Sequence, residues 1–177
     1  MSRSVRTPAD AGRLLADLGA SPWLVRHHEL VVEAMQVLAS RVHGELGVAF
    51  DQDLTLLGAA LHDAGKVIHL GEMSGPGHEH EAAGEQLLIS QGIPEKVARF
   101  CVTHACWDDD DRTVEDLLVA LADKLWKGKR EEGLEQRAVA LIAQLTHREP
   151  WQVFAPFDAI CEAIAADGPD RLERSRT

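Results

Sequence analysis

Apolar residues recur at intervals of three and four along most of this chain, which is the spacing that places them on one face of an α-helix. The segment 26–42 shows the pattern most clearly. Its apolar face consists of Leu30, Val31, Ala34, Val37, Leu38 and Val42. No segment shows the alternation that is typical of a half-buried strand. Because 45% of the residues are hydrophobic but only 5% are aromatic, we predict an all-α fold that packs through small and medium aliphatic side chains.

The length of 177 residues suits one domain with a substantial core, since a split would leave two thin halves. Further helices are predicted at 54–66, 80–91, 94–107, 114–126, 134–148 and 156–167. Asp53 is expected to cap the first of these and Gly65 to end it. The glycine-rich stretch after Lys66 is expected to be a loop that could act as a lid. We expect one domain over 1–177, with C-terminal helices over 131–168 and a polar, frayed tail over 169–177.

Charge and composition exclude several classes of partner. The formal net charge of −11 argues against a stable complex with nucleic acid, which would be repelled by the average field. No stretch reaches the roughly 20 apolar residues that a bilayer span needs, so we expect no membrane partner and a cytoplasmic location. Cys101, Cys106 and Cys161 have no CxxC spacing. They are expected to be buried free thiols instead of a disulfide framework or a zinc ribbon.

An imidazole and a carboxylate adjoin at the end of an apolar helix, in His62 and Asp63. This donor pair suits Zn, Fe, Mn or Ni better than a metal that prefers thiolates. The alternative is an ion pair at the helix end. Asp123 lies within the apolar run LLVALADKLW, where an unpaired carboxylate would be costly to bury and a metal would compensate it. Lys124 or Lys127 could be its partner instead.

Three sequence segments together resemble the HD-domain metal-dependent phosphohydrolases. They are LVRHHELVVEA with His27, ALHDAGK with His62 and Asp63, and LVALADKLWKGKR with Asp123. The resemblance spans roughly residues 24–130, and it implies a helical HD fold in which these four residues bind metal. His28 is the alternative to His27. Since the valines that follow His27 stand where the family's helix would have them, we expect His28 to be an exposed neighbour.

A subset of that family adds two histidines and holds two metals, and His80 and His104 lie where those ligands would fall. His78 is an alternative to His80, and both positions could instead be core or cleft histidines. This pattern is similar to that of the diadenosine tetraphosphate hydrolases. The likeness to the cyclic dinucleotide phosphodiesterases is more distant, because their Gly-Tyr-Pro signature is missing. The resemblance implies a divalent transition metal, two ions of Fe, Mn, Ni, Zn or Co.

The chemistry of these residues fits hydrolysis at phosphorus. The two oxygens of Asp63 could bridge two ions about 3.5–4 Å apart, which would share a water nucleophile. Lys66 is expected to contact a phosphate, or else to be a solvated helix end. Lys124 and Lys127, with Lys129 and Arg130, are expected to form a cationic rim, or else to complement the helix end.

We therefore predict an enzyme with Asp63 and Lys66 as catalytic residues and Lys66, Lys124 and Lys127 as substrate contacts. It would cleave a phosphoester or phosphoanhydride of a small phosphorylated compound, a nucleotide or similar. Two alternatives keep the metal site. One is a di-iron oxygenase of the HD-domain type, and the other is a nucleotide-binding metal protein without enzymatic activity.

Overall fold

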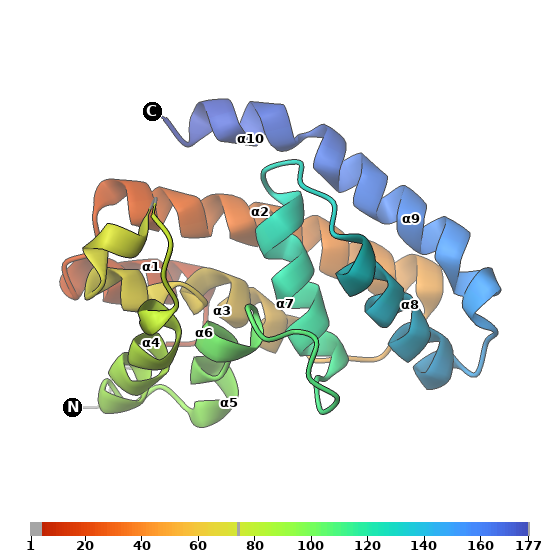
Figure 1. Ribbon diagram of the computed structural model, residues 1–177, viewed down its shortest axis with the longest axis horizontal. Helices are drawn as coiled ribbons and strands as arrows, with labels where there is room; N and C mark the ends of the chain where they lie inside the picture. The colour runs from red at the N-terminus through yellow and green to blue at the C-terminus, as the bar shows by residue number, and fades with distance from the viewer. Residues whose placement is uncertain (1–4, 74, 177) are drawn as a thin grey trace.

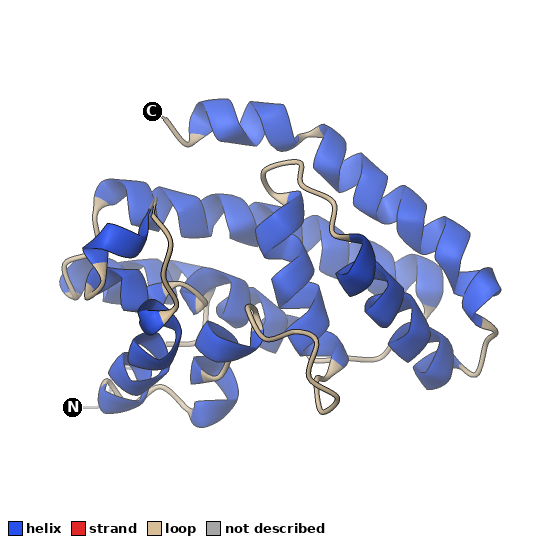
Figure 2. Ribbon diagram, viewed as in Figure 1, coloured by secondary structure: helices blue, strands red, loops and turns tan. Residues whose placement is uncertain are grey.

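The computed structural model describes residues 5–73 and 75–176, and this part of the chain contains helices and loops but no strand (Figures 1 and 2). The predicted all-α fold is confirmed. The α-helices are α1 (Pro8–Asp17), α2 (Pro22–Leu46), α3 (Gln52–Leu61), α4 (Glu79–Ser90), α5 (Glu95–Ala98), α6 (Phe100–Thr103), α7 (Val114–Leu125), α8 (Glu132–Thr146), α9 (Pro150–Ala166) and α10 (Gly168–Arg174). Two short 3₁₀ helices, η1 (Ala64–Val67) and η2 (Leu70–Met73), follow α3. Within the described ranges, no helix is both long enough and apolar enough to span a membrane.

Helix starts follow the capping residues of the sequence. The hydroxyl groups of Thr7 and Thr113 each accept a hydrogen bond from a backbone N–H in the first turn. In return, the carboxylates of Asp10 and Asp116 accept hydrogen bonds from the backbone N–H groups of the two threonines. Asp51 caps α3, because its Oδ1 accepts a hydrogen bond from Leu54 N at 2.9 Å. The prediction that Asp53 is the cap was wrong, since that residue lies exposed in the first turn.

The core is built around α2, α3 and α7, which pack against one another. Helix α7 crosses this centre in Figure 1, and every residue from 117 to 122 is buried. Helices α8 and α9 pack on α7 and on each other, and α9 also covers α2. Helices α4, α5 and α6 form a separate group beside α3. The ends of α2, α3 and α7 therefore point their polar side chains into one interior region.

The region 94–107 contains two short helices, whereas the sequence predicted one long one. Helix α5 ends at Ala98 and α6 begins at Phe100. Arg99 lies between them, and its carbonyl oxygen accepts hydrogen bonds from both Val102 N at 2.9 Å and Thr103 N at 3.0 Å. The acidic stretch that follows forms turns.

The expected frayed tail over 169–177 is instead largely helix α10, which returns along the N-terminal half of α2 (Figure 1). Arg171 is 2% exposed, and its Nε lies 3.2 Å from Glu33 Oε1. Arg174 donates two hydrogen bonds of 2.8 Å to the same carboxylate. The segment looks polar in sequence, but two of its arginines are paired with a glutamate on another helix. Thr177 lies outside the described residues.

Candidate metal centre

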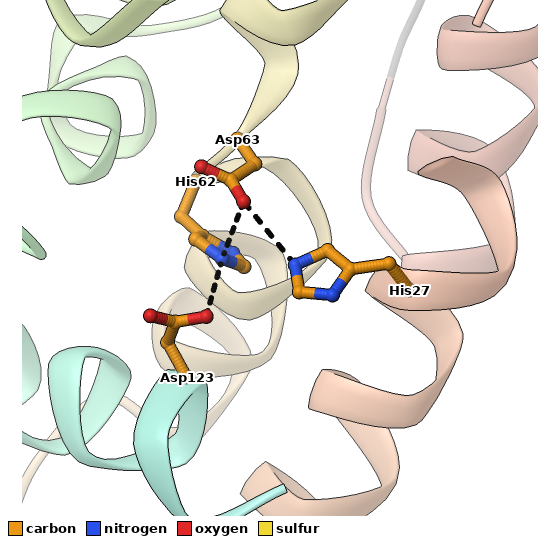
Figure 3. Close-up of side chains that lie close together, drawn as sticks. All are labelled: His27, His62, Asp63 and Asp123. Carbon is orange, nitrogen blue, oxygen red and sulfur yellow. Dashed lines mark ion pairs between the residues drawn. The ribbon is translucent and has the colours of Figure 1, made fainter. Parts of the chain in front are cut away.

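Four polar side chains from three helices meet in the interior of the bundle (Figure 3). His27 comes from α2, His62 and Asp63 from the end of α3, and Asp123 from α7. All four are buried. Neighbouring helix positions normally diverge by about 100°. Here His62 and Asp63 can face one centre because α3 ends at Leu61, and Asp63 has a φ of −103° and a ψ of 19°.

Asp63 lies at the centre of this first cluster. Its Oδ2 is 3.2 Å from His27 Nε2 and 3.6 Å from His62 Nε2. His62 Nε2 is also 3.4 Å from Asp123 Oδ1. One donor atom from each of the four residues lies within 4.8 Å of the others, so the cluster could hold a metal ion.

The other oxygen of Asp63 belongs to a second cluster. Its Oδ1 lies 3.3 Å from Nε2 of His80, in the first turn of α4, and 3.6 Å from Nε2 of His104, which caps the end of α6. Both histidines are buried. The structure thus brings together all six residues that the sequence predicted as ligands, and it divides them between the two oxygens of one carboxylate. His78, the alternative to His80, is exposed and pairs with Glu81.

Hydrogen bonds on the far side of three rings aim their other nitrogen at the centre. His62 Nδ1 lies 3.0 Å from Ala59 O, and His104 Nδ1 lies 2.8 Å from Phe100 O. His80 Nδ1 contacts the carboxylate of Glu72. Since each of these oxygens accepts a hydrogen bond from Nδ1–H, the Nε2 atom of each ring faces Asp63. This is the arrangement that metal-binding histidines adopt.

Several buried atoms at the centre have no hydrogen-bond partner. They are both ring nitrogens of His27, His62 Nε2 and Asp63 Oδ1. The distances of 3.2–3.6 Å between these groups are short enough for ion pairing, but these atoms form no hydrogen bond. Buried polar atoms without partners are costly. The donor set of imidazole and carboxylate groups therefore fits a divalent transition metal, which would supply the missing partner.

The electrostatics of the site favour anionic aspartates, whereas its histidines differ. Burial opposes the charge of Asp63, but His62, His27 and His80 around it hold its pKa well below the usual range. Burial also opposes the charge of Asp123, but contact with His62 and Lys124 holds the pKa of this carboxyl group well below the usual range. Burial lowers the pKa of His27 and lowers that of His104 to about 4, but the neighbouring carboxylates raise the pKa of His62 and His80 against burial. A neutral histidine and an ionised carboxylate are the forms that bind metal.

His28 is buried at 3% exposure, so the expectation of an exposed neighbour was wrong. Its Nδ1 lies 2.9 Å from Leu24 O, and its Nε2 accepts a hydrogen bond from the backbone N–H of Asp63 at 3.3 Å. Burial, together with the neighbouring His62 and His27, holds its pKa well below the usual value, so the ring is neutral. His28 therefore supports the backbone of the Asp63 turn and does not itself join either cluster.

Two glycines allow the backbone of α4 to approach Asp63. A Cβ on Gly65 would overlap the carbonyl oxygen of His80, and a Cβ on Gly84 would lie 2.7 Å from Gly65 N. Gly65 lies in η1, where the absence of a side chain allows this close approach. The prediction that Gly65 ends the preceding helix was wrong, because α3 already ends at Leu61. The contact places His80 next to the Asp63 carboxylate.

A cavity of about 750 Å³ opens over both clusters. The three lysines that the sequence assigned to substrate all line it, with Lys66 Nζ 2.6 Å from Asp63 Oδ2 and Lys124 Nζ 3.1 Å from Asp123 Oδ2. Lys127 lines the same cavity. The walls also include Trp23, Trp126, Leu172 and Ser175. The site therefore combines buried carboxylates with cationic and aromatic side chains.

Glu72 is a site residue that the sequence did not indicate. It lies in η2, within the stretch expected to be a loop, and its carboxylate contacts His80. Hydrogen bonds from His80 N and from the His80 ring lower its pKa to about 2, so it is anionic. No spacing rule connects a loop glutamate with a histidine at the start of the next helix. Only the fold of the loop brings the two together.

An all-α bundle in which buried histidines and aspartates converge on one carboxylate defines a helical domain with a metal-binding core. Comparison with known sequences gives the family. This chain belongs to the HD-domain family, whose sequence profile matches residues 24–127, and so to the HD metal-dependent phosphohydrolase superfamily. The matched region contains all six residues of the two clusters.

One curated relative is a protein of Thermoplasma volcanium named tRNA (cytidine(56)-2′-O)-methyltransferase, which is 26% identical over 138 residues. The match covers 70% of this chain and 37% of that relative, so the chain spans little more than a third of the relative's length. No solved structure matches the chain significantly.

Proposed function

We propose that this chain is a phosphohydrolase that cleaves a phosphoester or phosphoanhydride of a small, nucleotide-like substrate with a metal-activated water. One observation carries the proposal: the two oxygens of the buried Asp63 carboxylate face two separate clusters of metal-binding side chains. Membership of the HD-domain family supports a metal-dependent hydrolase. The name of the methyltransferase relative indicates no substrate for this chain.

In this proposal His27, His62, Asp63 and Asp123 hold one divalent ion, and Asp63, His80 and His104 hold a second. The donor set accepts Fe, Mn, Ni, Zn or Co. Bound metal would supply an activated water and withdraw charge from a phosphoryl oxygen. Asp63 would contribute a ligand to both ions. This two-ion ligand pattern is similar to that of the diadenosine tetraphosphate hydrolase branch of the family.

The three lysines of the cavity supply the positive charge that a phosphorylated substrate needs. The net charge of −11 would otherwise repel an anion. Lys66 lies directly beside the Asp63 carboxylate, and it would contact the phosphoryl group near the reacting atoms. Lys124, in the last turn of α7, and Lys127, just after that helix, also line the cavity and would bind the remaining phosphates. Trp23 and Trp126 offer aromatic faces for an apolar part of the substrate.

The test is substitution of the shared carboxylate. Asp63→Ala should abolish both metal retention, measured by elemental analysis of protein purified without chelator, and turnover of phosphomonoesters, dinucleoside polyphosphates and cyclic nucleotides. Asp53→Ala is the matched control, because Asp53 is an exposed aspartate on the same helix and should leave both unchanged. An Asp63→Ala protein that hydrolyses these substrates without metal would overturn the proposal.

A further inference from the structure

Glu72 connects the loop after α3 to the second cluster through several bonds on one carboxylate. Its Oε1 accepts a hydrogen bond from Glu79 N at 3.2 Å. Its Oε2 accepts one from His80 N at 3.0 Å and also contacts His80 Nδ1. The side chain is 12% exposed, although it belongs to a loop. The carboxylate therefore caps the start of α4 and holds the His80 ring at the same time.

Gly77 leaves the space in the loop that the Glu72 carboxylate occupies. Gly77 has a positive φ of 154°, and a Cβ at that position would overlap the Glu72 carboxyl group. Any larger residue at 77 would have to push the Glu72 side chain away from α4. A cap on a helix start needs backbone contacts only, so the contact with the His80 ring requires a separate explanation.

The two clusters differ in what fixes their rings. In the first cluster, His62 is held by the carbonyl oxygen of Ala59 within its own helical segment, and His27 stacks on Trp23 at a centroid distance of 5.7 Å. In the second cluster, His104 is held by the carbonyl oxygen of Phe100, again a local backbone group. His80 is the exception, because its ring depends on a charged side chain from a separate loop.

We propose that Glu72 is a positioning residue for the second metal subsite, where it fixes the His80 ring so that Nε2 faces Asp63. The inference rests on the metal site of the proposed function. A carboxylate that accepts the Nδ1 proton fixes the tautomer and raises the basicity of the other ring nitrogen. Occupation of the second subsite is thereby coupled to the order of the loop around η2, whereas the first subsite is independent of that loop.

Titration of metal-free protein with Co²⁺, followed by visible absorption, tests this. The wild type should take up two equivalents. Glu72→Gln should bind the first equivalent as the wild type does and the second roughly 10- to 100-fold more weakly. Glu79→Gln is the matched control, because Glu79 is the adjacent carboxylate on α4 but its side chain is 80% exposed. It should bind both equivalents normally.

A second variant separates ring positioning from the loss of a charge. Gly77→Ala keeps the carboxylate but displaces it, so it should weaken the second equivalent in the same way. Circular dichroism identifies variants that have failed to fold. Glu72→Gln and Gly77→Ala proteins that bind both equivalents as the wild type does, or that lose both equally while folded, would overturn the inference. A wild type that binds a single equivalent would overturn this inference and the second ion of the proposed function, but hydrolysis with one ion at the first subsite would still stand. A wild type that binds none would overturn the inference and the proposed function together.

Discussion

His28 is a single side chain whose two ring nitrogens bond to the backbone of two different segments. Its Nδ1 lies 2.9 Å from Leu24 O on its own helix, and its Nε2 accepts the N–H of Asp63 at 3.3 Å. The Asp63 peptide has left the helix by this point, so the bond from His28 fixes the direction of the turn. The carboxylate shared by both clusters thus depends on a residue that belongs to neither cluster.

Replacement of His28 should therefore weaken metal binding without removing a ligand. We expect His28→Leu to lower metal affinity roughly 10- to 100-fold and to cost about 1–3 kcal/mol of unfolding free energy, because the buried Asp63 N–H loses its acceptor. His28→Gln offers an amide oxygen as acceptor and an amide N–H as donor. It should therefore recover part of the metal affinity and part of the unfolding free energy. Metal titration and urea unfolding measure the two effects. Equal metal affinity in wild type and His28→Leu would contradict this role.

The role of the cavity lysines in substrate binding can be tested at Lys127, which lines the cavity without an ion pair to Asp63 or Asp123. Lys127→Met should raise KM for a phosphorylated substrate about tenfold, corresponding to about 1.4 kcal/mol, and leave the metal content unchanged. Lys129→Met is the control, since Lys129 lies near Glu131 at 3.9 Å and does not line the cavity. Steady-state kinetics of both variants decide the matter. A KM that rises equally in both would indicate a general charge effect.

The sequence predicted which residues meet at the centre, but it did not predict what holds them there. His62 and Asp63 could be found because an imidazole and a carboxylate adjoin at the end of an apolar helix, whereas His27 was indicated by the resemblance to the HD-domain family. Glu72 and His28 look like ordinary polar residues, since their roles depend on hydrogen bonds formed after the chain has folded. Their burial follows from tertiary contacts and not from local spacing.

At the scale of elements, α10 is the helix whose position depends most on charge. Glu33 on α2 accepts hydrogen bonds from Arg171 and Arg174, and the bonds from Arg174 are the main cause of its lowered pKa. A folded pKa below the unfolded value adds stability above the ordinary glutamate pKa of 4.5, and that stability is lost as pH falls through the lowered value. Docking of α10 should therefore weaken in acid.

Glu33→Gln measures this contribution. At neutral pH it should lower the unfolding free energy by about 1 kcal/mol, a modest figure because solvent screens the half-exposed carboxylate. The difference from wild type should disappear as the pH falls through the lowered pKa of Glu33. Urea unfolding at neutral and acid pH provides the measurement. Glu29→Gln on the same helix, where Glu29 pairs only with Arg26 at 2.9 Å, controls for a simple change in net charge.

The helices whose bounds the sequence predicted most closely are α4 and α7, since the predicted ranges 80–91 and 114–126 differ from Glu79–Ser90 and Val114–Leu125 by at most one residue at each end. The errors fall at places where local pattern and tertiary contact disagree. The segment 169–177 carries no strong apolar face, yet most of it is helical because Arg171 is buried against Glu33. Likewise the pattern across 94–107 indicates one helix, and the spacing of apolar residues cannot show the interruption at Arg99.

At the scale of the whole molecule, the buried clusters make stability depend on metal. Binding to the folded chain alone adds about 2.7 kcal/mol when free metal exceeds Kd about 100-fold. For a chain of this size, removal of metal by a chelator should lower Tm by roughly 5–11 °C, and return of the metal should restore it. Thermal unfolding followed by circular dichroism tests this. Asp63→Ala should show no chelator effect, and an unchanged Tm in the wild type would contradict the prediction.

The contact between Gly65 and Gly84 has a consequence for how such domains diverge. Adding one methyl group at either position would push α4 away from the turn that carries Asp63. His80 would then be lost to the site, whereas His27, His62 and Asp123 would remain on their own helices. A lineage could thus pass from two-ion to one-ion chemistry through a mutation that alters no ligand. When related sequences are compared, the two glycines should predict ion number as well as the histidines do.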